Sequence, residues 1–412
     1  MLTQDKLIQI RNFVILLAVL TLLFGIANNT HAKKAKRIET HVNDSVSLRL
    51  TGRFMHDFLV NSSVDANNES SNDWRRARLG IRAKLGDDWR VRLSGDFPDG
   101  ELELRDLRVD YRAWPIHFAA GRIQEPFGLS ETSNSNYLVL MERPLATAIG
   151  PDYSTGIQAN TRGRNWGVSI GAFDSELAGL ELTNSDRNND KAITARGTWK
   201  AIRNDSVLLH LGASASRRKP KANRGVRFNT RPETILVSGS NISHPRILDT
   251  QEYTLTGLEF GLRHGPRLLQ AEYFMADINR LTSSVSNNNP SFNGFYAQAS
   301  WALTGERRRY RTRSGSFSGI VPKKELTHFD SKFWQTGAWE IAVRYSTLNL
   351  RDTDVDLDGD IDGEEGQTIT LGLNWYPTGN SKIMLNTSRI TEKNGRTTDS
   401  DTLIQMRAQF FF

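Results

Sequence analysis

Apolar and polar residues alternate along most of this chain, in segments of roughly ten residues that begin near residue 45. In Trp74–Phe97, for example, Leu79 and Ile81 alternate with cationic or small residues. This period of two predicts β-strands, because successive side chains of a strand point to opposite faces of the sheet. The predicted strands are 45–60, 73–85, 88–97, 101–112, 115–123, 152–162, 165–174, 190–201, 204–216, 251–263, 266–276, 293–303, 336–348, 367–376, 380–390 and 401–412.

The connections between these strands alternate between short turns and long loops. Gly86–Asp87 and Gly163–Arg164 are short, whereas 124–151 and 217–250 are long and rich in Asn, Ser, Asp and Gly. Short turns on one side and long loops on the other are typical of outer-membrane barrels, which have an even number of strands. Only 304–335 is long on the short-turn side. The sixteen segments therefore predict an all-β fold, a sixteen-stranded antiparallel transmembrane β-barrel.

Aromatic residues favour the same fold. The last segment alternates up to Phe412, which suits a strand that closes a barrel and leaves no free edge. A soluble β-sandwich or β-solenoid is the alternative, but no repeat of fixed length supports a solenoid. The tryptophans near the short-turn side, where an interfacial girdle belongs, are Trp89, Trp114, Trp166, Trp199, Trp301 and Trp375.

The N-terminus carries an export signal. The apolar run Phe13–Ile26 follows Lys6 and Arg11 and is too short to span a bilayer as a helix. It predicts a cleaved signal peptide over 1–32. Residues 33–44 are then predicted to form an N-terminal periplasmic segment, and 45–412 the barrel. The 412-residue chain has no cysteine, so neither disulfides nor thiolate sites are expected.

Charge changes the picture of the barrel interior. The formal net charge is +7, and arginines occupy the polar face of several predicted strands. Like charges that face each other across strands repel, so such a row needs water or anions beside it. A barrel of sixteen strands leaves an aqueous channel, and arginine binds oxyanions through two parallel hydrogen bonds. The predicted inward set also includes Arg108, Arg112, Arg196 and Arg344, with Asp96, Asp110 and Glu340 as counter-charges.

Enzyme chemistry has no sequence support. The eight histidines show no metal-binding pair, and neither a Gly-x-Ser-x-Gly motif nor a glycine-rich phosphate loop occurs. No nucleic-acid module is present either, so the cationic residues are predicted to serve small anions and not nucleic acid. The pattern therefore predicts a channel and no catalytic residue.

Several stretches, taken in order, point to one family. They are WRRARLG (74–80), GRIQEPFGLSE (121–131), MERPLA (141–146), TGIQA (155–159), FYAQASWALTGERRRY (295–310), GAWEIAVRYSTL (337–348), LGLNWYP (371–377) and the terminal strand. Together they resemble the phosphate- and polyphosphate-selective porins of the Gram-negative outer membrane. The resemblance implies a homotrimer of barrels, surrounded by lipid and lipopolysaccharide, in which inward-folded segments narrow each pore and cations guide phosphate or polyphosphate.

The resemblance also implies roles for individual cations. Some fall where the family contacts anions, whereas Arg227 and Arg231 resemble a series that leads to the constriction. Arg311 and Lys323 lie in the long connection, which resembles a segment that enters the pore from the periplasm. Combined with the strand pattern, the predicted pore-lining set is Arg53, Arg75, Arg76, Arg78, Arg82, Lys84, Arg90, Arg92, Arg143, Arg227, Arg231, Arg311 and Lys323.

Glu131 departs from the family pattern. The phosphate-selective members carry a lysine at the aligned position, near the narrowest point of the pore. A carboxylate there disfavours a tight phosphate site and makes a weakly selective general porin the alternative function. Pairing of Glu131 with Arg122 or Arg143, away from the pore, is the other interpretation.

One predicted loop suggests a cation site. Its carboxylates occupy positions 1, 3, 5, 7, 9 and 12 of a calcium loop with EF-hand spacing, and Gly359 occupies position 6. A solvated acidic loop is the alternative, since strands and not helices flank it. A calcium-binding surface or adhesin barrel with little conductance is thus a third hypothesis. The predicted ligands are Asp354, Asp356, Asp358, Asp360, Asp362 and Glu365.

Overall fold

The computed structural model describes most of the chain from residue 38 onward. The described ranges are 38–64, 71–98, 100–174, 190–204, 206–221, 225–237, 241–281, 289–327, 332–352, 363–395 and 397–412. The predicted signal peptide, 1–32, lies outside them. Among the described residues, none of the helices is both long and apolar enough to cross a bilayer.

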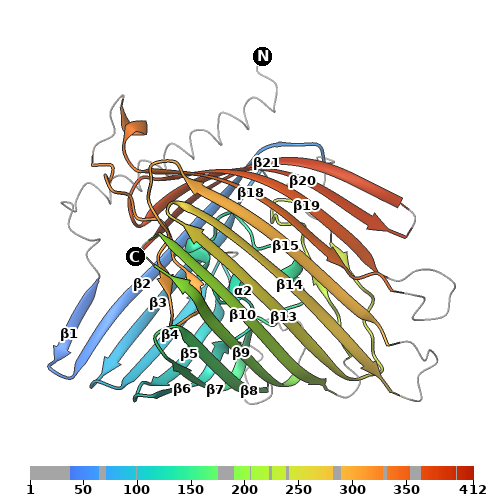
Figure 1. Cartoon of the computed structure of the whole chain (residues 1–412), viewed down its shortest axis with the longest axis horizontal. Coiled ribbons are helices and arrows are strands. Elements are labelled where there is room, and N and C mark those ends of the chain that lie inside the picture. The colour runs from blue at the N-terminus through green and yellow to red at the C-terminus, as the bar shows by residue number, and fades with distance from the viewer. Residues whose placement is uncertain are drawn as a thin grey trace.

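Sixteen antiparallel strands form a closed barrel, which confirms the predicted fold (Figure 1). Each strand pairs with its neighbours in sequence, and β2 pairs with β21 to close the wall. The barrel strands are β2 (Val46–Ser62), β3 (Asn72–Leu85), β4 (Trp89–Asp96), β5 (Glu103–Tyr111), β6 (Ile116–Gln124), β7 (Tyr153–Arg162), β8 (Trp166–Asp174), β9 (Asp190–Arg203), β10 (Val207–Pro220), β13 (Thr250–His264), β14 (Arg267–Arg280), β15 (Ser291–Ala302), β18 (Ala338–Asn349), β19 (Glu364–Tyr376), β20 (Ser381–Asn394) and β21 (Thr397–Phe411).

A seventeenth strand, β1 (Glu39–Asn43), was not predicted. It lies within the segment assigned to the periplasm and forms a hairpin with the start of β2. The C-terminal Phe412 pairs with Gly52 of β2, and Ile38 bonds to Leu50 two residues away. Strands β21 and β1 therefore follow each other along one edge of β2. Because β1 is short and exposed, the sequence shows no alternation that would reveal it.

The outer surface of the barrel is apolar, as a lipid-facing surface requires. On β18, for example, Ile341, Val343 and Tyr345 are exposed while the residues between them are buried. Five of the six predicted girdle tryptophans are exposed near the short turns, on the side that faces the periplasm in such barrels. The exception is Trp375, which is 6% exposed.

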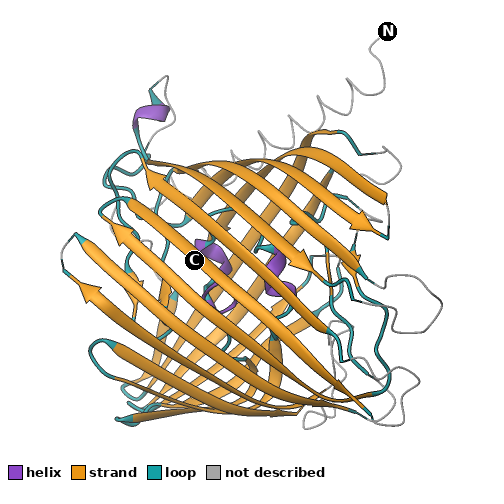
Figure 2. Ribbon diagram, turned by 45° about the vertical axis from the view of Figure 1, so that its right-hand side comes forward, coloured by secondary structure: helices purple, strands orange, loops and turns teal. Residues whose placement is uncertain are grey.

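Three connections fold into the barrel (Figure 2). They are the described parts of 125–152, with the helical turns α2 (Leu129–Thr132), η2 (Ser135–Tyr137) and η3 (Leu145–Ala148); of 221–249, with β11 (Asn229–Thr230) and β12 (Ile242–Ser243); and of 303–337, with β16 (Tyr310–Arg311) and β17 (Ser316–Phe317) inside the barrel. The last connection also contains η5 (Phe333–Gln335), which lies beyond the strand ends (Figure 2). The predicted inward-folded loops are therefore present, including the long connection on the short-turn side.

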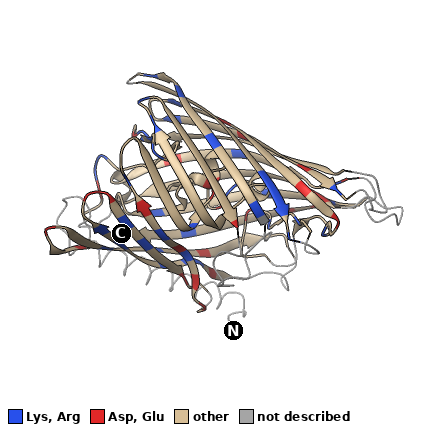
Figure 3. Ribbon diagram, turned by 90° about the horizontal axis from the view of Figure 1, so that it is seen from below, with Lys and Arg blue, Asp and Glu red and all other residues tan. Residues whose placement is uncertain are grey.

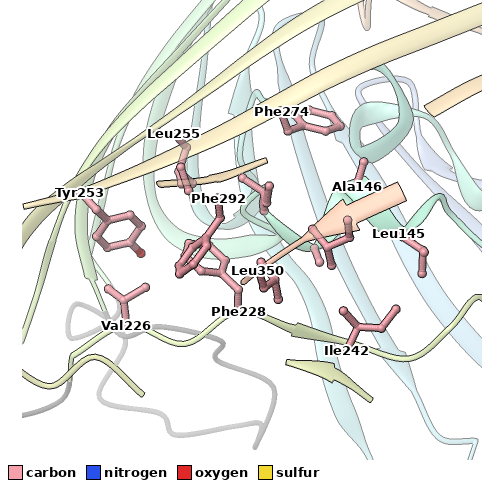
Figure 4. Packing of buried hydrophobic residues seen from close by; sticks show 14 of the residues in the cluster. Leu145, Ala146, Val226, Phe228, Ile242, Tyr253, Leu255, Phe274, Phe292 and Leu350 are labelled. Carbon is pink, nitrogen blue, oxygen red and sulfur yellow. The ribbon is translucent and has the colours of Figure 1, made fainter. Parts of the chain in front are cut away.

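An apolar core fills one side of the interior. Phe274 on β14 and Phe292 on β15 pack with residues of the inward segments, among them Leu145, Phe228 and Ile242 (Figure 4). Burial of such side chains contributes about 1.5–3 kcal/mol each, which is sufficient to hold a loop against a wall. The inward segments therefore belong to the folded core.

Buried ion pairs fasten the inward segments to the same side. Arg308 of segment 303–337 binds Glu340 of β18 at 2.8 Å, and Arg344 of β18 pairs with Glu233 of segment 221–249. Arg196 binds Glu259 of β13 at 2.7 Å and also donates to the Gly315 carbonyl. The predicted lumen residues Arg196 and Arg344 thus face inward but hold the structure together, because these contacts occupy their guanidinium groups.

Candidate functional site

The opposite side of the interior holds a water-accessible cavity of about 1260 Å³. Strands β2 to β5 form its wall, and the inward segments form its other side. Thirteen arginines and six carboxylates line it, so the lining carries a clear cationic excess. Figure 3 shows Lys and Arg recurring on neighbouring strands of the barrel wall. The lining arginines are Arg49, Arg53, Arg75, Arg76, Arg78, Arg82, Arg92, Arg105, Arg143, Arg227, Arg231, Arg246 and Arg311.

Strand register aligns four arginines across the wall. Arg49 faces Arg82, Arg82 faces Arg92, and Arg92 faces Arg108. Directly opposed side chains in an antiparallel sheet lie about 5 Å apart at Cβ, so these like charges repel strongly in the absence of water or anions. Asp106 lies 3.5 Å from Arg92 and Asp110 lies 3.2 Å from Arg108, so these two carboxylates offset part of the charge of the row. The row is therefore a preorganised cationic surface.

A β-bulge lets two consecutive arginines reach the cavity. In a regular strand Arg75 and Arg76 would point to opposite faces, but the pairing of β2 and β3 shifts register at this point. Arg75 turns to Glu142, with Nε–Oε1 and Nη2–Oε2 distances of 2.6 and 2.8 Å. Arg76 turns to Asp96 on β4. Both arginines therefore lie at the cavity lining, but Arg75 is bound to the inward segment through Glu142, whereas Arg76 belongs to the barrel wall.

Asp96 is the acceptor around which this bulge is organised. It is 3% exposed. One carboxylate oxygen accepts the backbone N–H of Ala77 at 3.0 Å. The other accepts Arg78 Nη2 at 2.7 Å and Arg76 Nη1 at 3.5 Å. Asp96 thus fixes the direction of two cavity arginines and offsets part of their charge.

Segment 125–152 borders the cavity with polar groups. Arg53 of β2 donates hydrogen bonds to the Ser135 hydroxyl and, at 2.8 Å, to Asn134 Oδ1. Arg143 donates to the carbonyl oxygens of Ser130 and Ser133 and so holds the α2 turn. Arg53 has no carboxylate within ion-pair distance among the described residues, so its charge faces the cavity uncompensated.

Glu131 pairs with Arg143 at the cavity lining and not away from it. It lines the cavity, and its Oε2 lies 3.4 Å from Nε of Arg143. It is 6% exposed. Since Arg143 also donates to three backbone carbonyls of residues 130–133, little of its guanidinium remains for a solute. Glu131 therefore reduces the positive charge of the cavity lining at this level.

Glu142 links the inward segment to the seam of the barrel. It accepts Arg75 and, at 2.6 Å, Nη2 of Arg407 on β21, and Arg407 also binds Asp57 of β2. Burial alone would raise the pKa of Glu142, but the charges of Arg75 and Arg407 hold its pKa well below the usual range. Glu142 therefore remains ionised, and Arg75 serves this network.

The remaining predicted cations lie at different levels. Arg227 and Arg231 line the cavity from segment 221–249, while Arg311 stands 4.9 Å over the Tyr137 ring. Lys84 binds Asp87 at the β3–β4 turn, and Arg90 donates to backbone oxygens there. Lys323 donates to the Thr304 carbonyl. Lys84, Arg90 and Lys323 are not among the residues that line the cavity.

Sequence prediction missed Arg49, Arg105 and Arg246 as lining residues. Alternation on the first strand places Arg49 on the same face as Arg53, which is a signal that could have identified it. Arg105 pairs with Glu103 at 2.7 Å and stacks on Tyr153. Arg246 lies in an inward segment without alternation, so no pattern could locate it.

The predicted calcium ligands mostly lie outside the described residues. Asp354, Asp356, Asp358, Asp360 and Asp362 belong to this group. Glu365 is described; it lies on β19 opposite Asn349 and accepts Gln367 Nε2 at 3.2 Å. Within the described ranges, no cluster of three or more His, Cys, Asp or Glu residues could hold a metal ion. The calcium site stays a prediction.

A closed sixteen-stranded barrel with an apolar outer surface and a charged interior narrowed by inward loops defines a porin of the Gram-negative outer membrane. Comparison with protein families places the chain within this class. The family described as "Phosphate-selective porin O and P" matches residues 48–412. The chain therefore belongs to the phosphate-selective porin O and P family, and it is an anion-preferring porin.

Individual relatives are distant. Porin O of Pseudomonas aeruginosa is 23% identical over 408 aligned residues, which cover 89% of this chain and 88% of that protein. An uncharacterized protein of Caulobacter vibrioides is 28% identical over 323 aligned residues, which cover 76% of this chain and 62% of that protein. At these identities the family is clear, while the contacts of single residues must come from the structure.

Solved structures support the fold. The anion-selective porin of Comamonas acidovorans aligns with a TM-score of 0.52 and 12% identity, over 89% of this chain and all of that one. The outer-membrane channel DcaP of Acinetobacter baumannii aligns with a TM-score of 0.53 and 10% identity, over 90% and 99%. The likeness to both structures concerns the fold alone.

Proposed function

We propose that this porin carries oxyanions, with inorganic phosphate and polyphosphate as preferred solutes, by passive diffusion through the arginine-lined cavity. The observation that carries the proposal is the excess of thirteen arginines over six carboxylates in the lining. Guanidinium groups stay charged at any physiological pH and match the geometry of phosphate oxygens. A cavity of this kind attracts oxyanions and repels cations.

Four arginines define the proposed path. Arg231, Arg53, Arg82 and Arg311 line the cavity, and no carboxylate lies within ion-pair distance of them in the described part of the chain. Arg53 on β2 faces Arg78 on β3, and Arg78 and Arg82 are four residues apart on β3. The levels of Arg53 and Arg82 are therefore separated by about 13 Å along the strand. Several separated sites of moderate strength let an anion enter without being trapped, as conduction requires.

Planar-bilayer recording of the purified porin tests this proposal. A KCl gradient should give a reversal potential that indicates anion preference, and phosphate added to KCl should block the chloride current. A reversal potential that indicates cation preference would contradict the anion path. Absence of conductance would contradict the pore itself and favour a surface or adhesin role.

Glu131 supports the second candidate, a weakly selective general porin. Its carboxylate engages Arg143 at the cavity lining and so removes positive charge from that level. Glu131→Lys changes the local charge by two units, whereas Glu131→Gln changes it by one. Phosphate block should strengthen from wild type to Gln to Lys. Equal block in all three would place Glu131 outside the path.

We infer that the barrels assemble as a homotrimer within lipid and lipopolysaccharide. A trimer form of Vibrio cholerae OmpT, with a TM-score of 0.52 and 12% identity, shares the fold and supports this proposal. Light scattering of detergent-solubilised protein should give three times the monomer mass of the mature chain. A monomer mass in mild detergents that preserve conductance would contradict it.

Calcium binding by the acidic loop is a separate proposal that rests on spacing alone. Titration calorimetry of the detergent-solubilised porin should show calcium binding that is lost in Asp354→Asn with Glu365→Gln. Glu365 is not among the lining residues of the cavity, so the conductance of Glu365→Gln alone should match wild type. Unchanged calcium binding in the double variant would exclude the loop as the site.

A further inference from the structure

The aromatic girdle contains one covered tryptophan. Trp375 and Trp339 lie side by side at the periplasmic ends of β19 and β18, with ring centroids 5.8 Å apart. Their neighbours Asn374 and Glu340 point into the barrel, where Asn374 donates to Glu340 at 3.0 Å. Since side chains alternate along a strand, both tryptophans face outward, toward lipid. Something outside the wall must therefore cover Trp375.

The covering element is η5, from the end of the connection 303–337. Phe333 packs edge-on against Trp375 with 5.4 Å between ring centroids. Trp339 Nε1 donates to the Trp334 carbonyl at 3.0 Å, and Trp375 Nε1 donates to the Thr336 carbonyl at 3.1 Å. This connection therefore enters the barrel with one part and lies on its outer rim with another. In Figure 1, η5 is the orange coil beyond the strand ends.

The turn that covers Trp375 exposes an aromatic residue of its own, Trp334. The indole N–H groups of Trp339 and Trp375 would otherwise reach lipid headgroups, and the carbonyls of Trp334 in η5 and of Thr336 directly after it accept both. Trp334 of the same turn is 55% exposed. A large aromatic side chain with a polar edge prefers the boundary between hydrocarbon and water over bulk water.

Cations surround this aromatic surface. Lys332 directly precedes η5 and is exposed, and Lys324 lies at its base, because its carbonyl accepts the Gly337 N–H at 2.7 Å. Two strands away, the Arg267 guanidinium lies 5.2 Å from the centroid of the outward-facing Trp301 ring. Glu325 is the one described carboxylate in 321–337, and it accepts the Gly379 N–H. Over 321–337 the sequence carries three lysines against Glu325 and Asp330, which is a net charge of +1.

We propose that η5, with Trp334, Lys332 and Lys324, forms a binding site for the anionic phospholipid headgroups of the periplasmic leaflet. The headgroup layer lies next to the level of Trp339, where the lipid-facing residues of β18 end. Phosphate groups complement the lysines, and the interfacial layer suits the indole of Trp334. The site is continuous with the lipid-facing surface of the barrel and separate from the anion cavity.

Lipid fits this surface better than a protein partner. η5 is a single short turn beyond the strand ends, and the neighbouring lipid-facing surface includes the exposed apolar residues Ile341 and Leu303. Aromatic residues beside cations at this level are the typical combination of membrane interfaces. A periplasmic protein or a neighbouring protomer would be detected as an outcome of the test.

Tryptophan fluorescence of the full porin in vesicles tests the site. The difference between wild-type and Trp334→Phe emission isolates Trp334 from the other tryptophans. Vesicles of phosphatidylcholine with phosphatidylglycerol carry bromine either on the phosphatidylglycerol or, at equal mole fraction, on the phosphatidylcholine. Bromine on phosphatidylglycerol should quench this signal about twofold more strongly at low salt. Lys332→Gln combined with Lys324→Gln should remove the preference. Trp166, on the distant strand β8, serves as the control through Trp166→Phe and should show no preference.

Three outcomes would overturn the proposal. Quenching of the Trp334 signal by aqueous iodide and not by brominated lipid would place the residue in water. Equal quenching by both brominated lipids would show that the site has no preference for anionic headgroups. Protection from lipid and iodide alike, lost on dissociation of the oligomer, would show a protein interface. Trp334→Phe should leave conductance and anion preference unchanged, so this result does not depend on the proposed anion path.

Discussion

Replacing Asp96 with asparagine should strengthen anion binding in the cavity. The carboxylate accepts Arg78 at 2.7 Å, Arg76 at 3.5 Å and the Ala77 N–H at 3.0 Å. Asparagine has the same shape and retains an oxygen that can accept from the bulge. The substitution therefore removes one negative charge while both arginines keep their place in the wall.

The size of the effect follows from geometry. An anion on the cavity side of Arg78 lies about 7 Å from the Asp96 carboxylate, with the guanidinium and two hydrogen-bond lengths between them. At an effective dielectric constant near 20, repulsion between two charges at this distance is about 2 kcal/mol. Salt and channel water reduce it to about 1 kcal/mol, which corresponds to roughly a fivefold change in affinity.

Phosphate block of the chloride current measures this change. The half-blocking phosphate concentration of Asp96→Asn should fall about fivefold, and the reversal potential should indicate stronger anion preference. Asp87→Asn is the matched control, because Asp87 makes its ion pair at an exposed turn with a 97% exposed side chain. Unchanged block in Asp96→Asn, or equal effects in both variants, would refute the assignment of Asp96 to the anion path.

Three further predictions concern other parts of the molecule. Arg82→Gln should reduce anion preference more than Arg90→Gln, since only Arg82 lines the cavity; reversal potentials compare them. Glu142→Gln should lower the unfolding temperature at pH 7. Because the pKa of Glu142 is held below its usual value, this stabilisation is fully present above the unfolded-state pKa. It disappears as pH falls through the folded-state pKa, so the two melting curves should converge in strong acid. Gly52→Ala should reduce the yield of folded barrel on heat-shift gels, because a Cβ there would lie 2.2 Å from the Phe412 ring. Gly197→Ala, with open space around it, should fold normally.

The fold could be predicted from this sequence because each barrel strand shows its alternation within about ten neighbouring residues. Alternation in each segment reports which side chains face lipid, and loop length reports which end of the barrel a connection occupies. The short strand β1 was missed because five exposed residues carry no such pattern. Trp375 was correctly placed near the short turns, but its covering by η5 depends on a segment forty residues away in sequence.

Site prediction was less complete because the role of an arginine depends on its partner. Arg75 and Arg76 are identical and adjacent in sequence, yet a bulge and the partners Glu142 and Asp96 give them different surroundings. The alternation of β18 correctly places Arg344 on the inward face, but Glu233 from a distant loop forms an ion pair with its guanidinium group. No local pattern indicates which carboxylate an inward loop will bring.

The sequence by itself determined that this protein is a charged-lumen barrel, since period-two alternation is a property of neighbouring residues. The tertiary structure decided where the charge remains available. Inward segments bury the cations of β9, β10, β18 and β21 in ion pairs and leave the arginines of β2 to β4 around an open cavity. Charges act over distances of several ångströms in space, whatever their separation in sequence, so only the folded chain determines which arginines meet a passing anion.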